Sequence, residues 1–416
     1  MNVLVVGGGG REHAIVHALS RSKKVTKIFA APGNAGIAQL AECVALKETQ
    51  IAELISFAKT NDVQLTVVGP EVALAAGIVD EFQKEDLRIF GPTRAAAQIE
   101  SSKEFSKRLM KKYAIPTAEY AVFDTYDAAL DYVKQGELPT VIKYDGLAAG
   151  KGVVIAETLE EADAALRDML LDDKYGKGKV VIEEFLTGPE FSFMCCVSNE
   201  KVYPLEVAQD HKRAFDGDKG PNTGGMGAYS PLPFISQHDI DWSYNHIMCA
   251  TANAMIAEGC SFKGVLYGGL MKTPKGIKVI EFNARFGDPE TEVVLPRLTS
   301  DIYDLFSAVV DESDEEPRLT WDSRAAIGVV LASKGYPENY DKGVEINNIA
   351  SLDAIVYHMG TAEKDGKYVT NGGRVLFITA MGDTLQEAQQ KANAEVAKIE
   401  CDNLFHRTDI GWQAIK

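Results

Sequence analysis

Residues 3–12 have the sequence Val3-Leu4-Val5-Val6-Gly7-Gly8-Gly9-Gly10-Arg11-Glu12, an apolar run followed by four glycines and the polar start of a helix. This order predicts a buried strand, a tight turn and a helix whose N-terminal N–H groups are free to bind a phosphate. Strand and helix patterns continue to alternate to residue 101, with further strands expected at 28–31, 65–68 and 89–90. Such alternation predicts an α/β domain built on a doubly wound parallel sheet.

The glycine turn departs from the dinucleotide-binding fingerprint at two places. A G-x-G-x-x-G pattern would need a glycine where Glu12 stands. The second strand should end in an acidic residue for the ribose hydroxyls, but it ends in Ala30-Ala31-Pro32. The sequence therefore disfavours a pyridine-nucleotide oxidoreductase. A site for a smaller phosphate-bearing ligand and a turn that serves packing alone both remain open.

The chain carries a strong negative charge. Its 416 residues include 43 Lys and Arg against 60 Asp and Glu, which gives a net charge of −17. A field of this sign repels nucleic acid and anionic membranes, so we expect neither as a partner. It also disfavours ATP at long range, so phosphates would have to be bound by glycine loops, helix N-termini, a few lysines and a metal ion.

The cysteines and the N-terminus predict a cytoplasmic protein. The six cysteines contain no C-x-x-C pair, so reduced, partly buried thiols are expected. The apolar run after Met1 has no basic segment before it and leads straight into glycines, unlike a signal peptide. No apolar run approaches the roughly 20 residues that a membrane-spanning helix needs.

The pattern changes several times after the first domain. A helical pattern covers 94–113, and hairpins then surround a helix expected at 159–171. The Gly-, Pro-, Asp- and Lys-rich stretch 209–233 is too long for a passive connection and is expected to be a functional loop. The acidic run 311–317 is expected to be a linker or a solvated loop. The tail is expected to be a small α+β unit whose helix opens with a capping box, Thr384-x-x-Glu387.

A lysine followed by a glycine-rich loop predicts a lid over phosphates. Val141-Ile142-Lys143 is a short strand with a lysine near its end, and Asp145-Gly146-Leu147-Ala148-Ala149-Gly150-Lys151-Gly152 follows as a flexible loop. Three glycines and a lysine in a mobile hairpin suit contacts with phosphates. The loop is not a Walker loop, because that pattern would need Ser or Thr where Gly152 stands.

The segment Val180-Val181-Ile182-Glu183-Glu184-Phe185-Leu186 predicts a strand with an apolar surface beside main-chain groups. Such a strand can bind a base through main-chain hydrogen bonds and stacking. Glu190, just beyond it, could accept hydrogen bonds from ribose hydroxyls. An ordinary hairpin with a solvated acidic pair remains the alternative.

The segment Glu281-Phe282-Asn283-Ala284-Arg285 predicts a metal site. On a strand, positions 281, 283 and 285 share one face, so a carboxylate, an amide oxygen and a guanidinium stand in a row. Hard oxygen ligands suit Mg²⁺, which usually bridges few protein groups to substrate phosphates. A structural ion pair remains the alternative.

Two polar residues follow strand ends in the first domain. Asn34 comes after Pro32-Gly33, and Glu71 comes after Gly69-Pro70. Both fall at the carboxyl edge of the sheet, where ligands of doubly wound sheets bind. They could bind sugar hydroxyls or an amine, and the alternative for each is a simple turn residue.

Several of these segments occur in the order found in the ATP-grasp superfamily. They are Lys103, Lys143, the loop 146–152, the segment 183–186 and the pair Glu281 and Asn283. The stretch Arg285-Phe286-Gly287-Asp288-Pro289-Glu290-Thr291 resembles the signature of the phosphoribosylamine–glycine ligase family, also called glycinamide ribonucleotide synthetases. The opening 6–13, the stretch 220–231 and the closing segments 371–375 and 407–411 are similar to it as well, so the resemblance spans the chain.

The resemblance implies a fold and an activity. The fold would be an N-terminal doubly wound domain at 1–101, an ATP-grasp core of two α+β subdomains at 102–315 with its lid at 117–190, and a small α+β C-terminal domain at 320–416. The activity would be an ATP-dependent carbon–nitrogen ligase of de novo purine biosynthesis, which joins glycine to 5-phosphoribosylamine and gives glycinamide ribonucleotide, ADP and phosphate. Mg²⁺ or Mn²⁺ would be the cofactor, ATP the co-substrate, and small molecules the partners of an expected monomer.

The resemblance also implies site residues. The ATP-binding residues would be Lys103, Lys143, Gly150 and Gly152 near the phosphates, Glu183, Phe185 and Leu186 near adenine, and Glu190 near the ribose. Glu281 and Asn283 would ligate the metal. The residues near phosphoribosylamine or glycine would be Gly9, Asn34, Glu71, Asp210, Asn222, Thr223, Gly224, Arg285, Gly287 and Asp288. Lys143, Arg285 and Asp288 would be catalytic.

The chemistry of such a ligase suggests a glycyl phosphate intermediate, because a carboxylate needs a leaving group before an amine can replace its oxygen. Lys143 and Arg285 would offset charge on the transferring phosphoryl group. Asp210 or Asp288 could bind the glycine ammonium. The stretch 265–272 contains no acid, so the sequence does not predict a second metal ligand on that strand, and Tyr144 stands where a small residue would be expected.

Two other functions remain to be distinguished. One is another ATP-grasp carboxylate–amine ligase of purine metabolism, which would share the nucleotide site but differ in the segments that contact the substrates. The other is a nucleotide-binding module without catalysis, against which Lys143, Glu281 and Asn283 argue.

Overall fold

The computed structural model describes residues 1–147, 152–172 and 174–415. Its N-terminal domain contains a five-stranded parallel sheet of order β3-β2-β1-β4-β5, which confirms the predicted doubly wound architecture. The strands are β1 (Asn2–Gly7), β2 (Lys27–Pro32), β3 (Glu42–Cys43), β4 (Val63–Val68) and β5 (Ile89–Phe90). The helices are α1 (Gly10–Ser20), α2 (Ile51–Thr60), α3 (Glu71–Ala76) and α4 (Ile78–Lys84), with a 3-10 turn η1 (Ile37–Gln39).

Strand β1 is buried on both faces. Val3 and Val5 belong to one apolar cluster together with residues of α1, whereas Leu4 and Val6 belong to another together with residues of α2 and α4. All four side chains have no exposed surface. A parallel strand covered by helices on both sides needs a continuous apolar run rather than an alternating one, and this is the pattern found at the start of the sequence.

The helical pattern predicted over 94–113 forms two helices, α5 (Arg94–Ser101) and α6 (Lys103–Lys112). The interruption is Ser102, whose extended backbone and hydroxyl cap α6 by accepting the N–H of Phe105 at 3.1 Å. Asp145 accepts the N–H groups of Lys103 and Glu104 at 2.5 and 3.1 Å. This second cap ties the start of α6 to the predicted lid.

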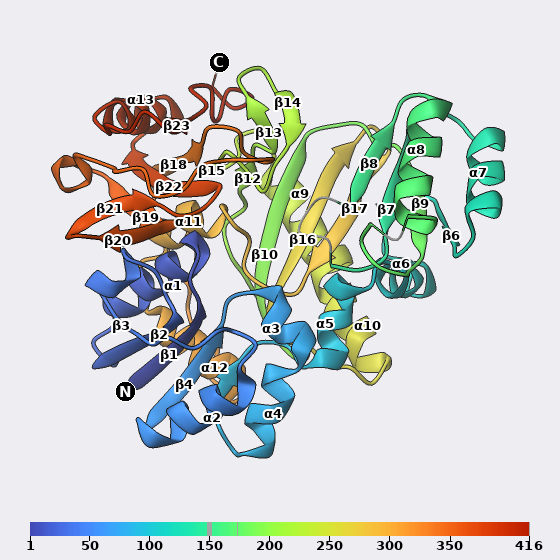
Figure 1. Cartoon of the computed structure of the whole chain (residues 1–416). Helices are drawn as coiled ribbons and strands as arrows, with labels where there is room; N and C mark the ends of the chain where they lie inside the picture. The colour runs from blue at the N-terminus through green and yellow to red at the C-terminus, as the bar shows by residue number, and fades with distance from the viewer. Residues whose placement is uncertain (148–151, 173, 416) are drawn as a thin grey trace.

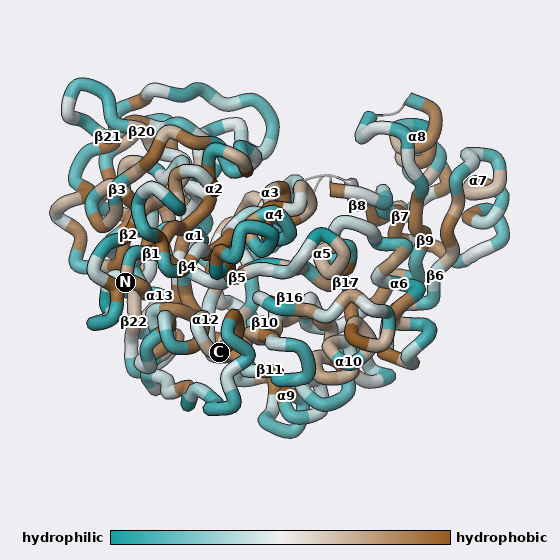
Figure 2. The backbone as a smooth tube through the Cα atoms, turned by 90° about the horizontal axis from the view of Figure 1, so that it is seen from below, coloured by the Kyte–Doolittle hydropathy of each residue, from teal (hydrophilic) through white to brown (hydrophobic). Residues whose placement is uncertain are grey.

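The middle domain contains two antiparallel four-stranded sheets, β11-β10-β16-β17 and β6-β9-β7-β8. The first is made of β10 (Glu190–Ser198), β11 (Lys201–Pro204), β16 (Lys263–Thr273) and β17 (Gly276–Asn283). The second is made of β6 (Tyr120–Phe123), β7 (Thr140–Tyr144), β8 (Val153–Ala156) and β9 (Val180–Glu184), with α7 (Tyr126–Gln135) and α8 (Leu159–Leu170) packed against it. In both views this second sheet, the lid subdomain, lies at the opposite end of the molecule from the N- and C-terminal domains (Figures 1 and 2).

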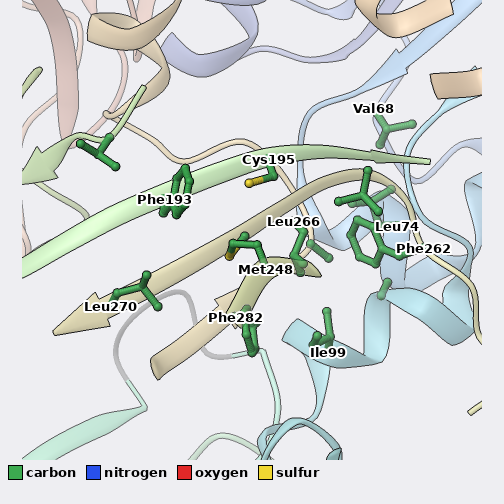
Figure 3. Packing of buried hydrophobic residues seen from close by; sticks show 14 of the residues in the cluster. Val68, Leu74, Ile99, Phe193, Cys195, Met248, Phe262, Leu266, Leu270 and Phe282 are labelled. Atoms are coloured by element: carbon green, nitrogen blue, oxygen red, sulfur yellow. The ribbon is translucent and has the colours of Figure 1, made fainter. Parts of the chain in front are cut away.

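The core of the middle domain packs between the sheet β11-β10-β16-β17 and the helices that cover one of its faces. Phe193 and Cys195 from β10 and Leu266 and Leu270 from β16 point into the same cluster as Phe282 from β17 (Figure 3). All five are at most 3% exposed. Phe282 therefore fixes the orientation of β17, and the residues on either side of it must face the other way.

The stretch 209–233, predicted as a functional loop, contains four short strands. They are β12 (Gln209–Asp210), β13 (Arg213–Phe215), β14 (Lys219–Asn222) and β15 (Gly227–Ser230). The strands β13 and β14 form a local hairpin, while β15 pairs with β18 of the C-terminal domain, Gly227 lying opposite Val329. The sequence does not indicate the pairing of β15, because its strand partner β18 lies far along the chain.

The C-terminal domain is built on a sheet of order β12-β15-β18-β22-β19, with β23 paired to β18. Its own strands are β18 (Ala325–Ser333), β19 (Ile355–His358), β20 (Thr361–Lys364), β21 (Lys367–Thr370), β22 (Arg374–Gly382) and β23 (Leu404–Phe405), and its helix is α13 (Leu385–Val396). The hydroxyl of Thr384 caps α13 by accepting the N–H of Glu387, as predicted, but the Glu387 carboxylate accepts from Asp383 rather than from Thr384.

The remaining helical segments cover the middle domain and its junctions. They are α9 (Gln237–Ser243), η2 (Tyr244–Cys249), α10 (Ala250–Ala257), α11 (Thr291–Val294), η3 (Leu295–Arg297), α12 (Ile302–Val310) and η4 (Ile349–Ser351). Within the described part of the chain, no helix has both the length and the apolar character needed to cross a membrane. The elements most important for the candidate site described below are the edge strand β17 and the short helix α11 that follows it.

Candidate active site

A cavity of about 380 Å³ lies between the lid subdomain, helix α6, strand β17 and segments of the N- and C-terminal domains. Residues from all three domains line it, so it exists only in the assembled fold. The predicted site residues along its wall are Glu71, Lys103, Lys143, Gly152, Glu183, Asp210, Thr223, Gly224, Glu281, Asn283, Arg285 and Asp288.

A buried carboxylate holds two lysines at the lid end of the cavity. Glu183 on β9 lies 2.9 Å from the Nζ of Lys107 and 3.0 Å from the Nζ of Lys143, and all three are at most 4% exposed. Lys143 also donates to the carbonyl of Ile280 at 3.1 Å. Burial lowers the pKa of Lys107 to about 8 although Glu183 opposes this shift. The two lysines are therefore oriented before any ligand arrives.

Lys103 lies where α6 meets the glycine-rich loop. Its Nζ donates to the carbonyl of Gly146 at 3.0 Å, and its backbone N–H is bound by Asp145. Burial lowers the pKa of Lys103, while nearby Glu281 and Asp145 partly offset the effect. Asp145 and Ser102 already cap the first turn of α6, so at this point the group available to a phosphate is the Lys103 ammonium, which lines the cavity.

Glu281 and Asn283 lie on one face of β17 and line the cavity, as their alternation with buried Phe282 predicts. Burial pushes the pKa of Glu281 upwards, but Lys143, Lys212 and Lys103 outweigh burial and lower the pKa overall. An ionised carboxylate and an amide oxygen fit a hard divalent cation. No cluster of three or more His, Cys, Asp or Glu side chains suitable for a metal occurs in the described ranges, so this pair would need oxygen ligands from a bound phosphate.

The next residue on that face, Arg285, lies close to two acids of the first domain, Glu71 and Glu100. Its guanidinium lies 3.2 Å from Glu100 and 3.7 Å from Glu71, and it donates weakly to the Asn283 amide oxygen at 3.4 Å. Burial alone would raise the pKa of Glu71, but Arg285 and Arg11 lower it. Glu71 is thus an ionised group at the carboxyl edge of the N-terminal sheet, where the sequence placed a candidate ligand.

Asp288 is bound by an arginine of the C-terminal domain. The Nη2 of Arg374 lies 2.9 Å from the Asp288 carboxylate, and its Nη1 donates to the carbonyls of Gly224 and Asp288 at 2.7 and 3.2 Å. Arg374 therefore joins two predicted substrate-binding segments, the turn at Gly224 and the loop at Asp288. Removing one partner of this partly buried pair leaves the other charge without its counter-ion.

Asp210 lies in a more acidic part of the cavity. Burial, helped by the nearby Glu290 and Glu190 and opposed by Lys212, raises the pKa of Asp210 to about 7. The Nζ of Lys212 lies 2.6 Å from Glu190 and 3.8 Å from Asp210. The predicted ribose ligand Glu190 is therefore tied to the substrate end of the cavity through one lysine.

Three predicted residues beside the substrate end do not line the cavity. The amide of Asn34 donates to the carbonyls of Gly8 and His358, and its oxygen accepts the N–H groups of Gly36 and Ile37, so it organises the turn. A Cβ at Gly9 would lie 3.6 Å from the Asp288 carboxylate, which places Gly9 next to the site. The N–H of Gly287 approaches the sulfur of Met194 at 3.2 Å.

Phe185, Leu186 and Asn222 are not among the described residues that line the cavity. Phe185 and Leu186 follow the end of β9, with the Phe185 side chain 39% exposed. Asn222 ends β14 and is exposed. Gly150 lies outside the described residues.

Several lining residues were not predicted from the sequence: Arg11, Glu100, Lys107, Lys212, Tyr267, Glu290 and Arg374. For two of them the sequence offers a signal: Lys107 follows Lys103 by one helical turn, and Lys212 follows Asp210 by two residues in the same polar stretch. Arg374 lies in the segment 371–375, whose sequence resembles the family. Arg11 and Glu290 also lie in such segments, 6–13 and 285–291, whereas Glu100 and Tyr267 reach the cavity through tertiary packing alone.

Three family models match the chain in order. Their descriptions are phosphoribosylglycinamide synthetase N domain for residues 1–100, ATP-grasp (A) domain for 101–291 and C domain for 326–413. The chain is 54% identical over 419 residues to a phosphoribosylamine–glycine ligase from Halalkalibacterium halodurans, an alignment that covers 100% of this chain and 97% of the relative.

Solved structures agree with these matches. A phosphoribosylamine–glycine ligase from Thermotoga maritima superposes with a TM-score of 0.84 at 35% identity, covering 99% of this chain and 100% of the other. The biotin carboxylase domain of the 2-oxoglutarate carboxylase from Hydrogenobacter thermophilus, solved with magnesium ADP, has a TM-score of 0.74 at 14% identity and covers 97% and 91% of the two chains. The second likeness concerns the fold alone.

One buried carboxyl beside the site has no partner in the described structure. Glu292, on α11, has no exposed surface, and neither of its oxygens accepts a hydrogen bond from a described residue. A Cβ at Gly10 would lie 2.5 Å from its Oε1, so it packs against the start of α1. Burial raises the pKa of Glu292 well above its usual range, and Asp288 adds to this effect while Arg374 opposes it.

We expect Glu292→Gln to stabilise the protein increasingly as the pH rises. A carboxyl with a raised pKa in the folded state binds its proton more tightly there, so wild-type stability falls with pH above the unfolded pKa of about 4.3, by up to about 1.4 kcal/mol per pH unit. Glutamine has no proton to lose. Urea denaturation of both proteins from pH 5 to pH 8 measures the difference, and a gap that does not grow with pH would contradict a protonated Glu292.

Proposed function

The chain belongs to the phosphoribosylglycinamide synthetase family and is an ATP-dependent ligase that joins glycine to 5-phosphoribosylamine in purine biosynthesis; we propose that it acts through glycyl phosphate in the cavity at β17. The observation that carries this proposal is the row of Glu281, Asn283 and Arg285 on one strand face, in the same cavity as Lys103 and Lys143. That row puts ligands for a metal–phosphate complex next to a cation suited to a carboxylate.

The proposed reaction has two steps. A carboxylate oxygen of glycine attacks the γ-phosphorus of ATP, the bond from that phosphorus to the bridging oxygen breaks, and ADP leaves. The uncharged amine of phosphoribosylamine then attacks the acyl carbon, inorganic phosphate leaves with the electron pair of the broken carbon–oxygen bond, and the amine loses a proton to give the amide of glycinamide ribonucleotide. Acyl phosphates hydrolyse, so the enclosing lid subdomain would also protect the intermediate from water.

ATP would lie between the lid subdomain and β17. Lys103 and Lys143 would bind its phosphates, which is supported by their positions on the cavity wall beside the glycine-rich loop. The main chain from Glu183 to Leu186 would bind adenine, and Glu190 the ribose. The Glu183 carboxylate already binds Lys107 and Lys143, so its contribution would be to hold these lysines while the main chain recognises the base.

Glu281 and Asn283 would hold Mg²⁺ or Mn²⁺, and Arg285 would face the carboxylate that receives the phosphoryl group. When bound, the metal supplies charge neutralisation for the transferring phosphoryl group. Arg285 orients the acceptor by its contacts with Glu100 and Glu71, which keep its guanidinium in place. Asp288, fixed by Arg374, would contribute to the phosphoribosylamine end.

The cellular location, oligomeric state and partners of the enzyme are also part of the proposal. We propose a cytoplasmic monomer that acts only on small molecules, supported by six cysteines that form no disulfide in the described structure and by the acidic net charge.

An ADP-release assay tests the proposed activity directly. ADP should appear when ATP, glycine and freshly made phosphoribosylamine are all present, and omission of any one should abolish sustained turnover. Another carboxylate–amine ligase would need a different acid or amine, and a non-catalytic nucleotide-binding protein would release no ADP with any amine.

Positional isotope exchange tests the intermediate. With ATP labelled at the bridging oxygen between its β- and γ-phosphorus atoms, glycine alone should allow the label to move into non-bridging positions, because phosphoryl transfer to glycine is reversible. The scrambling is followed by phosphorus NMR with glycine and without it. Absence of glycine-dependent scrambling in an enzyme that completes the full reaction would contradict glycyl phosphate.

Glu281→Ala should lower kcat by about 1000-fold or more, since it removes a charged ligand from the proposed metal–phosphate complex. Steady-state ADP release over a range of Mg²⁺ and Mn²⁺ concentrations measures the effect. Glu258→Gln, which changes an exposed carboxylate paired with Lys112 far from the cavity, is the control and should retain wild-type turnover. Near-full activity of Glu281→Ala would remove this residue from the mechanism.

A further inference from the structure

Lys107 lines the cavity at its lid end, and the proposed reaction gives it no role of its own. It lies on α6, in the part of the middle domain outside the lid subdomain, whereas Lys143 on β7 and Glu183 on β9 belong to the lid sheet. Glu183 stands opposite Val141 in the pairing of β9 with β7, so it shares a sheet face with Lys143, two residues further along β7. One lysine from each side of the lid boundary therefore meets a single carboxylate.

The two oxygens of Glu183 are bound differently. Oε2 lies 2.9 Å from the Nζ of Lys107, and Oε1 lies 3.0 Å from the Nζ of Lys143. Oε1 nevertheless accepts no hydrogen bond from a described residue, and the hydrogen bond that Lys143 donates goes to the carbonyl of Ile280 at 3.1 Å. The contact between Lys143 and Glu183 is therefore an attraction of charges without a directed hydrogen bond.

Lys107 is held more firmly than Lys143. Its Nζ donates to the hydroxyl of Thr117 at 2.8 Å, and that hydroxyl donates to the carbonyl of Val279 at 2.7 Å. Leu109, on the same helix, packs in the same apolar cluster as Phe282 of β17. The ammonium of Lys107 is thus fixed by β17 on one side and by Glu183 on the other.

The two lysines allow one of them to change partner. In the proposed function Lys143 binds the phosphates of ATP, and these compete with Glu183 for the same ammonium. If Lys143 were the sole cation beside Glu183, its departure would leave a buried carboxylate unpaired, which costs several kcal/mol. With Lys107 in place, the carboxylate keeps a counter-ion after Lys143 has turned to the nucleotide.

We infer that Lys107 is a positioning residue for the reaction: it is the permanent counter-ion of Glu183 and so allows Lys143 to leave that carboxylate for the phosphates of ATP. This inference rests on the proposed function and deepens it. The contact between Lys107 and Glu183 also joins α6 to β9, so the lid sheet keeps an attachment when Lys143 leaves the carbonyl of Ile280.

Two other roles are compatible with the position of Lys107. A lysine on the cavity wall could contact ATP itself, and a buried ion pair could serve stability alone. The three roles differ in what happens when the Glu183 carboxylate is removed as well. Only a counter-ion becomes dispensable once its carboxylate is gone.

Lys107→Met tests the inference by leaving Glu183 with Lys143 as its one close lysine. The KM of ATP and the Kd of ATP should both rise about 10- to 100-fold, because the phosphates must then draw Lys143 away from an unpaired carboxylate. The KM of glycine should stay within about twofold. The assays are run at pH 7, below the pKa of about 8 that burial gives Lys107, so the wild-type lysine is mostly protonated.

The double variant Lys107→Met with Glu183→Gln gives the decisive comparison. Glutamine removes the negative charge that holds Lys143, so the KM of ATP should fall at least about fivefold from its value in Lys107→Met alone. Glu183→Gln is measured by itself to complete the double-mutant cycle. A direct contact between Lys107 and ATP predicts no such recovery.

Lys111→Met is the matched control. Lys111 lies one turn further along α6, is exposed, and is not among the described residues that line the cavity. Its Nζ lies 5.9 Å from the centre of the Tyr120 ring. The same substitution at this position should leave the KM of ATP, the Kd of ATP and the KM of glycine unchanged.

Each outcome decides between the roles. A KM of ATP that is unchanged in Lys107→Met, or raised equally in the single and the double variant, overturns the inference while the ligase activity of the wild-type protein stands. A wild-type protein without glycine-dependent ADP release overturns the proposed function itself. Urea denaturation checks folding. If Lys107→Met does not fold, Lys107→Gln takes its place, and failure of both to fold would assign Lys107 a structural role and contradict the inference.

Discussion

Partly buried charges paired across domain boundaries connect the walls of the cavity. Arg374 of the C-terminal domain lies 2.9 Å from Asp288, and Arg285 on the face of β17 lies 3.2 Å from Glu100 on α5. Each pair costs desolvation energy that its attraction only partly returns, so such pairs add little to stability. Their effect is geometric, because Arg374 binds Asp288 and the Gly224 carbonyl at once, and Arg285 approaches both Glu100 and Glu71. The three domains are thereby fixed relative to one another at the place where the substrates would meet.

The charged side chains are also unevenly distributed along the cavity. The lid end carries Lys103, Lys107 and Lys143, the last two bound to Glu183, and this end suits the phosphates of ATP. The other end carries the acids Asp210 and Glu290 together with Lys212, which lies 3.8 Å from Asp210. Strand β17 lies between them and presents oxygen ligands for a metal. A protein with a net charge of −17 can therefore bind a triphosphate, because the cations are concentrated at short range where the long-range field matters least.

The C-terminal domain is part of the site rather than an addition to it. Strand β15, which follows the turn at Gly224, pairs with β18, and Arg374 at the start of β22 donates to the Gly224 carbonyl at 2.7 Å. A stretch that looks like a long loop in the sequence is thus held by the sheet of another domain. This accounts for its composition: glycines and prolines shape the turn, and short paired segments fix its ends.

The sequence by itself determined the elements and the faces of the site. Apolar runs and glycine turns predicted the doubly wound sheet, and the alternation around Phe282 put Glu281, Asn283 and Arg285 on one face, because side-chain direction along a strand is a local property. Only the tertiary structure decided which side chains contact one another in the site. Glu290 and Ser192 are 98 residues apart, and Arg374 and Asp288 are 86 apart, so no local pattern could pair them. The tertiary structure also decided the role of Asn34, a candidate ligand by its position. All of its side-chain hydrogen bonds go to backbone groups of the turn and of His358, because packing selects among the roles that a residue type allows.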